Sequence, residues 1–277
     1  MGQTQTTSIV VNEIAVDSET CDISDICWLS DGKFLLTDRA NSRLKILNAA
    51  YKFITSITLE GSPFGVCETE LSQAAVTCQT PRGPDRIQLI STNNGLTKKG
   101  DIEVPCRCNG IAYTGGLLYV CCGRTFDTDD NKDGGHIRLY SLSGTMNYCI
   151  PNSSEEMIFY EPLYIVASDD VKHVHVTDAK NGVVTIDTRR NVHYTVPTQS
   201  DFTSPRGICE TSCDNIIVCD SKSNALVDMI LTKTKVEVTV KESGRLENPQ
   251  AVCFDGKKGN ILVACGNSNS IELFSAY

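Results

Sequence analysis

The sequence has no apolar run that approaches the roughly 18 residues needed to cross a membrane. Its first residues, MGQTQTTSIVV, show neither the basic nor the apolar segment of a secretory signal. Helix-period stretches and helix caps are scarce. No G-x-S-x-G, H-E-x-x-H or phosphate-binding loop occurs in the 277 residues. These absences predict a cytoplasmic protein that has no membrane span and is not an enzyme.

Positive charge and histidine are also in short supply. The chain has 25 Lys and Arg against 34 Asp and Glu, a formal net charge of -9 at pH 7. This excess of negative charge disfavours broad binding to nucleic acid or anionic membranes, although it is compatible with a local basic patch. Of the four His, His173 and His175 alternate on a predicted strand. We expect them to face the surface as a pair.

What the sequence does contain is a repeat. A turn, a β-rich run, a second apolar run, a polar turn and an alternating segment recur six times, at steps of about 40 to 54 residues. One equivalent position is occupied by Cys27, Cys67, Ala112, Val166, Cys209 and Cys253. The step matches the blade period of a β-propeller, and each copy has material for four short strands.

The sixth copy is one strand short, and a spare strand precedes the first copy. Pairing of the two would close the ring and leave no exposed sheet edge. The sequence therefore predicts one all-β domain, residues 8–277, folded as a six-bladed β-propeller. The predicted blades are about 21–60, 61–105, 106–150, 160–197, 203–241 and 247–277, with strand 8–18 completing the sixth.

The first copy, DICWLSDGKFLLTDRANSRLKIL, resembles an NHL repeat. The matching residues are Asp31, Gly32, Asp38, Asn41 and Arg43. The fourth copy keeps Asp178 and Asn181, and the fifth keeps Asp220. The other copies depart from the pattern, with Cys78, Cys122 and Cys265 at the Asp position.

As a whole, the chain resembles the C-terminal propeller of tripartite-motif (TRIM) proteins over nearly all of its length. The segments SPFGVCETELSQAAVTCQ and SPRGICETSCDNIIVCDS contribute most to this resemblance. It implies a non-catalytic module that recognises a partner protein or RNA, in a family associated with ubiquitination. The RING, B-box and coiled-coil patterns of full members are not found in these residues, so ligase activity is not carried over.

Fourteen Cys without a secretory signal predict a reducing compartment and mostly free thiols. Most of them fall at repeated positions that suit small residues, where a free Cys packs as a small hydrophobe. Cys121 and Cys219, for example, share a place with Thr37, Thr77, Thr177 and Ala264. The stretch from Arg206 to Asp220 has three Cys and no nearby His, which is too few ligands for zinc. Cys213 and Cys106-x-Cys108 lie outside the repeated positions, and Cys213 is expected to be the exposed, reactive thiol.

Two further motifs are open to more than one interpretation. Asp129, Asn131 and Asp133 fit the first half of a calcium loop, but Tyr140 stands where a bidentate Glu is needed. A solvated hairpin insertion is therefore favoured, and calcium is the alternative; no other cofactor is expected. A calcium-dependent hydrolase or lyase propeller is a third functional alternative. Gly2 and Thr6 fit the loose myristoylation pattern or an ordinary start.

In a propeller, the start of each innermost strand and the turn between the second and third strands open on one face. The starts are Ser24, Phe64, Asn109, Leu163, Arg206 and Gln250, and the turns contain Arg39, Arg82, Arg124, Lys180 and Lys222. Asp38, Asp178 and Asp220 begin three of the turns and are expected to cap turn N–H groups.

We predict that this face binds an acidic peptide or protein segment through its cations and a few apolar anchors. One alternative is that these cations only solvate the loops. The other is single-stranded RNA, which would need stacking aromatics, and Phe64 and Phe126 are the evident ones.

Overall fold

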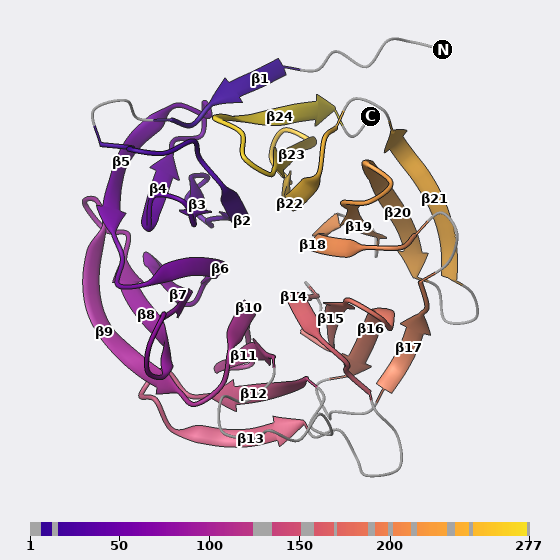
Figure 1. Ribbon diagram of the computed structural model, residues 1–277, viewed down its shortest axis with the longest axis horizontal. Coiled ribbons are helices and arrows are strands. Elements are labelled where there is room, and N and C mark those ends of the chain that lie inside the picture. The colour runs from indigo at the N-terminus through magenta and orange to yellow at the C-terminus, as the bar shows by residue number, and fades with distance from the viewer. Residues whose placement is uncertain are drawn as a thin grey trace.

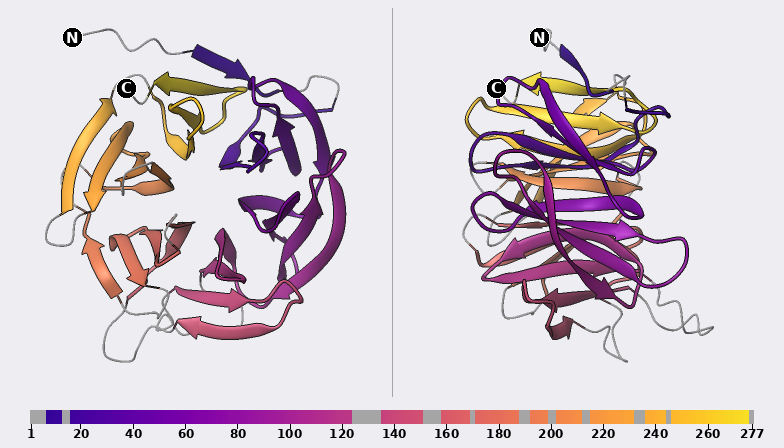
Figure 2. Two further views of the ribbon diagram at one scale, coloured as in Figure 1. Left: turned by 180° about the vertical axis from the view of Figure 1, so that it is seen from behind. Right: turned by 90° about the vertical axis from the view of Figure 1, so that its left-hand side faces the viewer.

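Six four-stranded antiparallel sheets are arranged around a central axis in the computed structural model, each sheet radiating outward like a blade (Figures 1 and 2). The structure describes residues 7–12, 16–123, 135–150, 158–168, 171–187, 192–198, 202–211, 215–231, 236–243 and 246–275. Every regular element among them is a strand, so the all-β prediction is confirmed. The described residues include no helix with the length and apolarity that a membrane span requires.

The strands follow one another from the axis outward in each blade. Blades one to three comprise β2 (Ile23–Trp28), β3 (Phe34–Asp38), β4 (Arg43–Leu47), β5 (Phe53–Thr58); β6 (Ser62–Glu68), β7 (Gln73–Gln79), β8 (Asp85–Ser91), β9 (Thr97–Val104); and β10 (Cys108–Thr114), β11 (Leu117–Cys122), β12 (His136–Tyr140), β13 (Met146–Ile150). Blades four to six comprise β14 (Pro162–Ala167), β15 (His173–Asp178), β16 (Gly182–Asp187), β17 (Val192–Val196); β18 (Pro205–Thr211), β19 (Asn215–Asp220), β20 (Ala225–Leu231), β21 (Val236–Ser243); and β22 (Pro249–Asp255), β23 (Asn260–Cys265), β24 (Ser270–Ser275).

The ring is closed as the sequence predicts. Strand β1 (Thr7–Val10) pairs antiparallel with β24, with Thr7 opposite Leu273 and Val10 opposite Ser270. The outermost strand of blade six thus comes from the other end of the chain, and the two ends meet at one side of the ring (Figure 1). The described closing strand is shorter than the predicted segment 8–18.

A buried lysine holds this closing segment against blade one. Lys45 on β4 is fully buried, and its Nζ lies 2.6 Å from Asp17 Oδ2 and 2.8 Å from Asp38 Oδ2. The same Nζ donates to the carbonyl of Val11 at 3.1 Å. Burial of so compact a charge is tolerable because two carboxylates and a carbonyl surround it. Hydrogen bonds to Asp17 and Asp38 outweigh the opposing effect of burial and raise the pKa of Lys45, so it stays charged.

Neighbouring blades touch backbone to backbone near the axis, where glycine is required. A Cβ on Gly110 would lie 2.7 Å from the Cα of Tyr164 in blade four. A Cβ on Gly65 would lie 2.9 Å from the Cα of Gly110. Gly207 is equally close to blade six, where its Cβ would lie 2.6 Å from Gln250 O. The repeated Gly of the segments FGV, NGI and RGI is therefore set by contact between blades.

The repeated second-strand position also joins neighbouring blades. Thr37 Oγ1 donates to Phe64 O at 3.0 Å, and Thr77 Oγ1 donates to Asn109 O at 2.6 Å. Cys121 and Cys219 fill the same place in blades three and five and are fully buried. The prediction that these cysteines pack as small residues is confirmed, and the structure adds that Thr37 and Thr77 at this place form hydrogen bonds between blades.

The predicted turn-capping role of the repeated Asp is also confirmed. Asp178 Oδ2 accepts from the backbone N–H groups of Tyr160 and Glu161 at 2.7 and 2.8 Å, and its Oδ1 accepts from those of Lys180 and Asn181. One carboxylate thus joins the start of the innermost strand to the turn after the second strand. Asp38 and Asp220 make the corresponding contacts in blades one and five. In blade two the third-strand residue Asp85 binds Thr80 N and Cys108 N instead.

The expectation of a surface-facing histidine pair is wrong for one partner. His175 is 4% exposed, and its Nδ1 lies 2.8 Å from Thr185 Oγ1 on the next strand. The rings of His173 and His175 lie 6.5 Å apart. His173 and His175 lie on the same face of their sheet. This face is buried at His175, because in a propeller both faces of a blade pack against neighbouring blades.

Candidate functional site

The ring has two faces, which we define by the innermost strands. The start face is the side on which these strands begin and the second strands end; the end face is the opposite side. Ala179 N donates to Glu161 O and Ser221 N donates to Ser204 O, so the second strand ends beside the start of the innermost strand. The starts and turns that carry the predicted binding residues therefore do lie on one face.

Three predicted residues form one cluster on the start face. Arg39 Nε and Nη2 lie 3.0 and 2.6 Å from Asp22 Oδ2, and Gln250 Nε2 donates to Asp22 Oδ1 at 2.9 Å. The Arg39 guanidinium also lies 5.9 Å from the centre of the Phe64 ring. Asp22, which sequence reasoning did not single out, thus binds Arg39 and Gln250 across blades one and six.

Two of the predicted binding residues are buried. Phe64 is 6% exposed and packs on Tyr164, with ring centres 5.1 Å apart. Asn109 accepts from Gln79 Nε2 at 3.0 Å through Oδ1 and donates from Nδ2 to Pro162 O at 2.9 Å, which links blades two, three and four. Both side chains are part of the packing around the axis.

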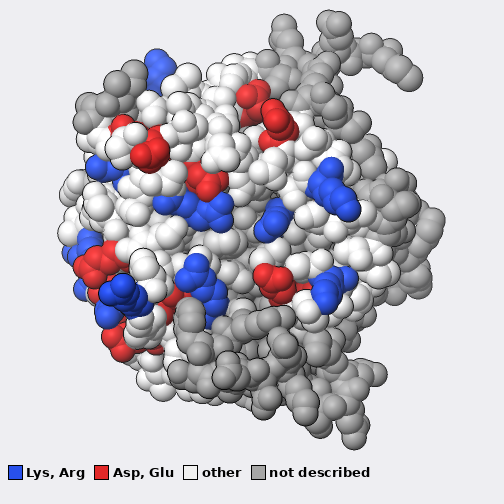
Figure 3. Space-filling model, in the orientation of Figure 1, with Lys and Arg blue, Asp and Glu red and all other residues white. Residues whose placement is uncertain are grey.

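The remaining described cations of this set are accessible. Arg82, Lys180 and Lys222 are exposed and Arg206 is half-buried. None of these four forms an ion pair with a carboxylate of the described residues. Lys180 Nζ lies 3.3 Å from the centre of the Tyr160 ring. Figure 3 shows one face of the ring, on which separate Lys and Arg side chains surround the centre with Asp and Glu among them.

A cavity of about 260 Å³ occupies the other end of the channel. The second halves of all six innermost strands line it, including the four equivalent thiols Cys27, Cys67, Cys209 and Cys253. Its acidic members are Asp25, Glu68 and Glu210, and its aromatic members are Trp28, Tyr113 and Phe254. None of the residues predicted for partner binding lines this cavity.

Burial raises the pKa of one acid and three thiols of the cavity. It raises the pKa of Asp25 to about 7, against the effect of hydrogen bonds from the N–H groups of Val66 and Ile26. Burial, with a contribution from Asp25, raises the pKa of Cys27 to about 12. The pKa values of Cys67 and Cys253 also rise well above the usual value. These three thiols are therefore protonated near neutral pH, and Asp25 titrates there.

Tyr164 lies between the two ends of the channel. It is 3% exposed, and burial and Asp25 raise its pKa, while Arg206 and Arg39 lower it. The ring is thus within electrostatic reach of the acidic cavity and of the start-face cations.

Sequence analysis did not identify Asp25 as a site residue, although its place in the repeat distinguishes it. The equivalent positions of the other copies carry Gly65, Gly110, Tyr164, Gly207 and Ala251, and Asp25 is the one charged residue among them.

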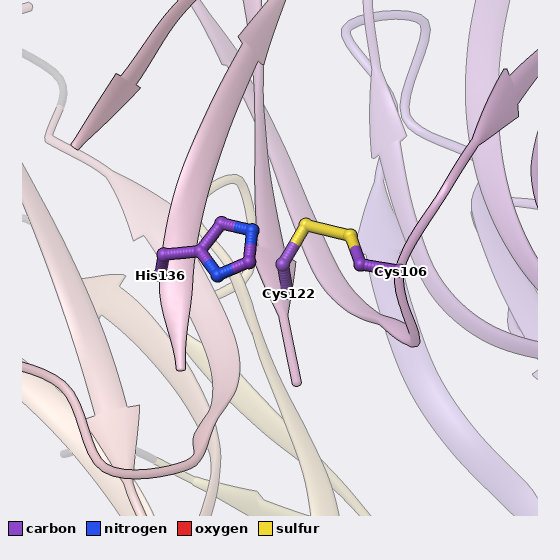
Figure 4. Close-up of side chains that lie close together, drawn as sticks. All are labelled: Cys106, Cys122 and His136. Atoms are coloured by element: carbon purple, nitrogen blue, oxygen red, sulfur yellow. A yellow bond between two sulfur atoms is a disulfide. The ribbon is translucent and has the colours of Figure 1, made fainter. Parts of the chain in front are cut away.

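A cluster of two cysteines and one histidine lies in blade three, apart from the start face and the cavity. Cys106 and Cys122 form a disulfide, with the imidazole of His136 beside it (Figure 4). This corrects the interpretation of Cys122 as a packed free thiol. The turn before β10 places Cys106 against the end of β11, so the two are neighbours within one blade. Eleven other described cysteines are free, in accord with the expectation of mostly free thiols.

The ligand atoms of Cys106, Cys122 and His136 all lie within 4.8 Å of one another. Metals bind the thiolate, so the two sulfurs can serve as ligands only after reduction. His136 Nε2 also accepts a hydrogen bond from Arg138 Nε at 3.0 Å. Several predicted sites fall outside the described residues: Gly2, Thr6, Arg124, Phe126, the calcium-loop candidates Asp129, Asn131 and Asp133, and Cys213.

Comparison with known proteins supports the fold. No protein-family model matches the sequence, and no curated protein matches it. Solved structures do match. The virginiamycin B lyase of Staphylococcus aureus superposes with a TM-score of 0.65 at 13% identity, over 99% of each chain. A putative oxidoreductase (glucose dehydrogenase) of Thermus thermophilus gives 0.66 at 13% identity, over 98% of this chain and 99% of that one.

A solved structure whose name does not indicate an enzyme matches equally well. The β-propeller domain of Cps50 (Swd1) from Myceliophteria thermophila gives a TM-score of 0.66 at 10% identity, over 92% of this chain and 84% of that one. The chain is a six-bladed β-propeller. Identities this low, shared with proteins of such different names, establish the fold and leave function to be argued from the site.

Proposed function

We propose that this propeller is a non-catalytic, cytosolic interaction module that recognises an acidic protein segment on its start face. The observation that carries the proposal is the set of accessible cations Arg82, Lys180 and Lys222, together with the half-buried Arg206 at the start of β18, none of which is ion-paired within the described residues. The resemblance to tripartite-motif propellers supports the same role, since partner recognition is what that family uses the domain for. Eleven of the described cysteines are free thiols, which supports the cytosolic location, and the Cys106–Cys122 disulfide is the exception.

The start face presents these cations on a rigid frame. Lys180 and Lys222 occupy equivalent turns of blades four and five, and the backbone N–H of each is bound by the capping Asp two residues earlier. Fixed turns lower the entropy that a partner must overcome on binding. Carboxylates of an acidic segment can accept charge-assisted hydrogen bonds from both ammonium groups.

Two observations favour protein over RNA. Phe64, an aromatic that base stacking would need, is buried under Arg39. Tyr160 is already covered by Lys180 Nζ. RNA-binding propellers of this type would need exposed aromatic faces among the cations.

Two further observations support a non-catalytic role. Within the described part of the chain, no His lines the channel cavity. The cavity thiols Cys27, Cys67 and Cys253 have raised pKa values and so are poor nucleophiles at neutral pH.

The test uses fluorescence anisotropy with two probes, a labelled Glu-rich peptide and a labelled oligouridine. We expect the wild-type protein to bind the peptide, and Lys180→Glu with Lys222→Glu to weaken binding by about tenfold, since exposed pairs contribute roughly 0.5–1 kcal/mol each. Lys52→Glu with Lys172→Glu is the matched control, because these exposed lysines lie on end-face turns. Equal loss in both double variants, or binding of oligouridine alone, would overturn the proposal.

A further inference from the structure

We propose that the cavity on the end face binds one basic side chain, Lys or Arg, presented by an extended segment of a partner protein. This site is separate from the start face and opposite in charge. Its wall is formed by the innermost strands of all six blades; aliphatic side chains and thiols make up most of it, and three carboxylates and three aromatic rings lie among them.

Two acidic groups of the cavity, Asp25 and Glu68, are held in place by N–H and O–H groups. Asp25 Oδ1 and Oδ2 accept from the backbone N–H groups of Ile26 and Val66, each at 2.9 Å. Glu68 is fixed by Ser30, whose N and Oγ donate to it at 2.9 and 2.8 Å. Within the described residues neither carboxylate forms an ion pair. A buried carboxylate that lacks a counter-ion gains most from a cation brought by a ligand.

The aromatic rings of the cavity suit the same kind of ligand. Trp28, Tyr113 and Phe254 contribute rings from blades one, three and six. Lys257 Nζ already lies 5.7 Å from the centre of the Trp28 ring, whereas no cation of the described residues lies over the rings of Tyr113 and Phe254, which therefore remain open to a ligand cation. A ligand ammonium or guanidinium placed between such rings and Asp25 would interact with both.

A peptide fits better than a free amine because of one further group. The buried Nε1 of Trp28 has no hydrogen-bond acceptor among the described residues. An unsatisfied buried N–H is costly, and because this atom is buried a ligand reaches it only if the Trp28 ring turns on binding; the carbonyl of a peptide group next to the basic side chain can then accept its hydrogen bond. The volume of about 260 Å³ lies just below the usual range for small-molecule pockets, and it is sufficient for one basic side chain.

The experiment uses the one Trp of the chain as its reporter. Trp28 emission is followed while the protein is titrated with acetyl-Gly-Arg-Gly-amide, with its Lys and Gln analogues, and with free agmatine. We expect saturable changes with the Arg or Lys peptide, at least about tenfold weaker binding of the Gln peptide, and weaker binding of agmatine than of the Arg peptide. Tighter binding of agmatine would show that the site takes free amines and overturn the peptide assignment.

Three variants complete the test. Asp25→Asn and Glu68→Gln should each weaken peptide binding by about tenfold or more, as is usual when one partner of a partly buried charge pair is removed. Glu103→Gln is the matched control, because this exposed side chain lies on the outermost strand β9 of blade two. Binding that is unchanged in both cavity variants, or reduced equally in the control, would refute the site. Either outcome leaves the start-face proposal untouched, since that test uses other residues and another probe.

Discussion

The pKa of Asp25 gives this protein an unusual dependence of stability on pH. A carboxyl that titrates near 7 in the folded protein and near 3.8 in the unfolded chain keeps its proton up to a higher pH in the folded state. Folding is therefore favoured at low pH, and this contribution is lost as the pH rises from about 4 to about 7. The full loss is at most about 4 kcal/mol, because water in the cavity can solvate part of the charge.

Asp25→Asn removes the titrating group and should remove this loss. Asn can accept only one of the two backbone N–H bonds, which costs roughly 1 kcal/mol at every pH. The informative quantity is thus the difference in unfolding free energy between wild type and variant as a function of pH. Groups that titrate in both proteins cancel in this difference.

Urea denaturation at about pH 5 and about pH 8, followed by circular dichroism, measures the effect. We expect the stability of the wild type relative to Asp25→Asn to fall by roughly 3 kcal/mol between these values. A difference that stays constant, or that rises with pH, would refute the reasoning that burial controls this carboxyl.

Two further predictions concern the closure and the disulfide. Lys45→Met should destabilise the protein by roughly 3–5 kcal/mol in urea denaturation, because Asp38 loses its cation and Asp17 keeps only the longer contact with Arg43 at 3.8 Å; a loss below about 1 kcal/mol would count against a buried triad. Cys106 and Cys122 are 16 residues apart, so reduction or Cys122→Ser should cost about 3 kcal/mol and lower the Tm by several degrees. Cys149→Ser, a half-buried free thiol, is the control, and a Tm insensitive to reductant would argue against the disulfide.

Much of the fold could be predicted because the repeat carries it. The positions of Cys27 and its five equivalents set the blade count, and the spare strand at the N-terminus predicted closure onto β24. The Asp caps could be predicted too, since Asp178 and Asp220 occur at one fixed place in the repeat. These are local or periodic patterns, and each copy repeats the same information.

The candidate sites were only partly predictable. The sequence placed Arg39, Phe64 and Gln250 on one face, but it could not show that Asp22 holds two of them or that Phe64 is buried beneath Arg39. Such contacts join different blades, whose side chains are far apart in the chain. The Cys106–Cys122 disulfide was missed for a related reason, because repeat alignment assigned Cys122 a packing role in common with other blades.

The sequence alone determined the all-β class, the number of blades and the cap at each repeated Asp, because these depend on period and on neighbours along the chain. Tertiary structure decided which side chains remain accessible and what charge each end of the channel bears. Asp25 shows why: its place in the repeat is visible in the sequence, but its pKa of about 7 arises only when six strands enclose it. Burial is a property of the assembled ring, and no single repeat contains it.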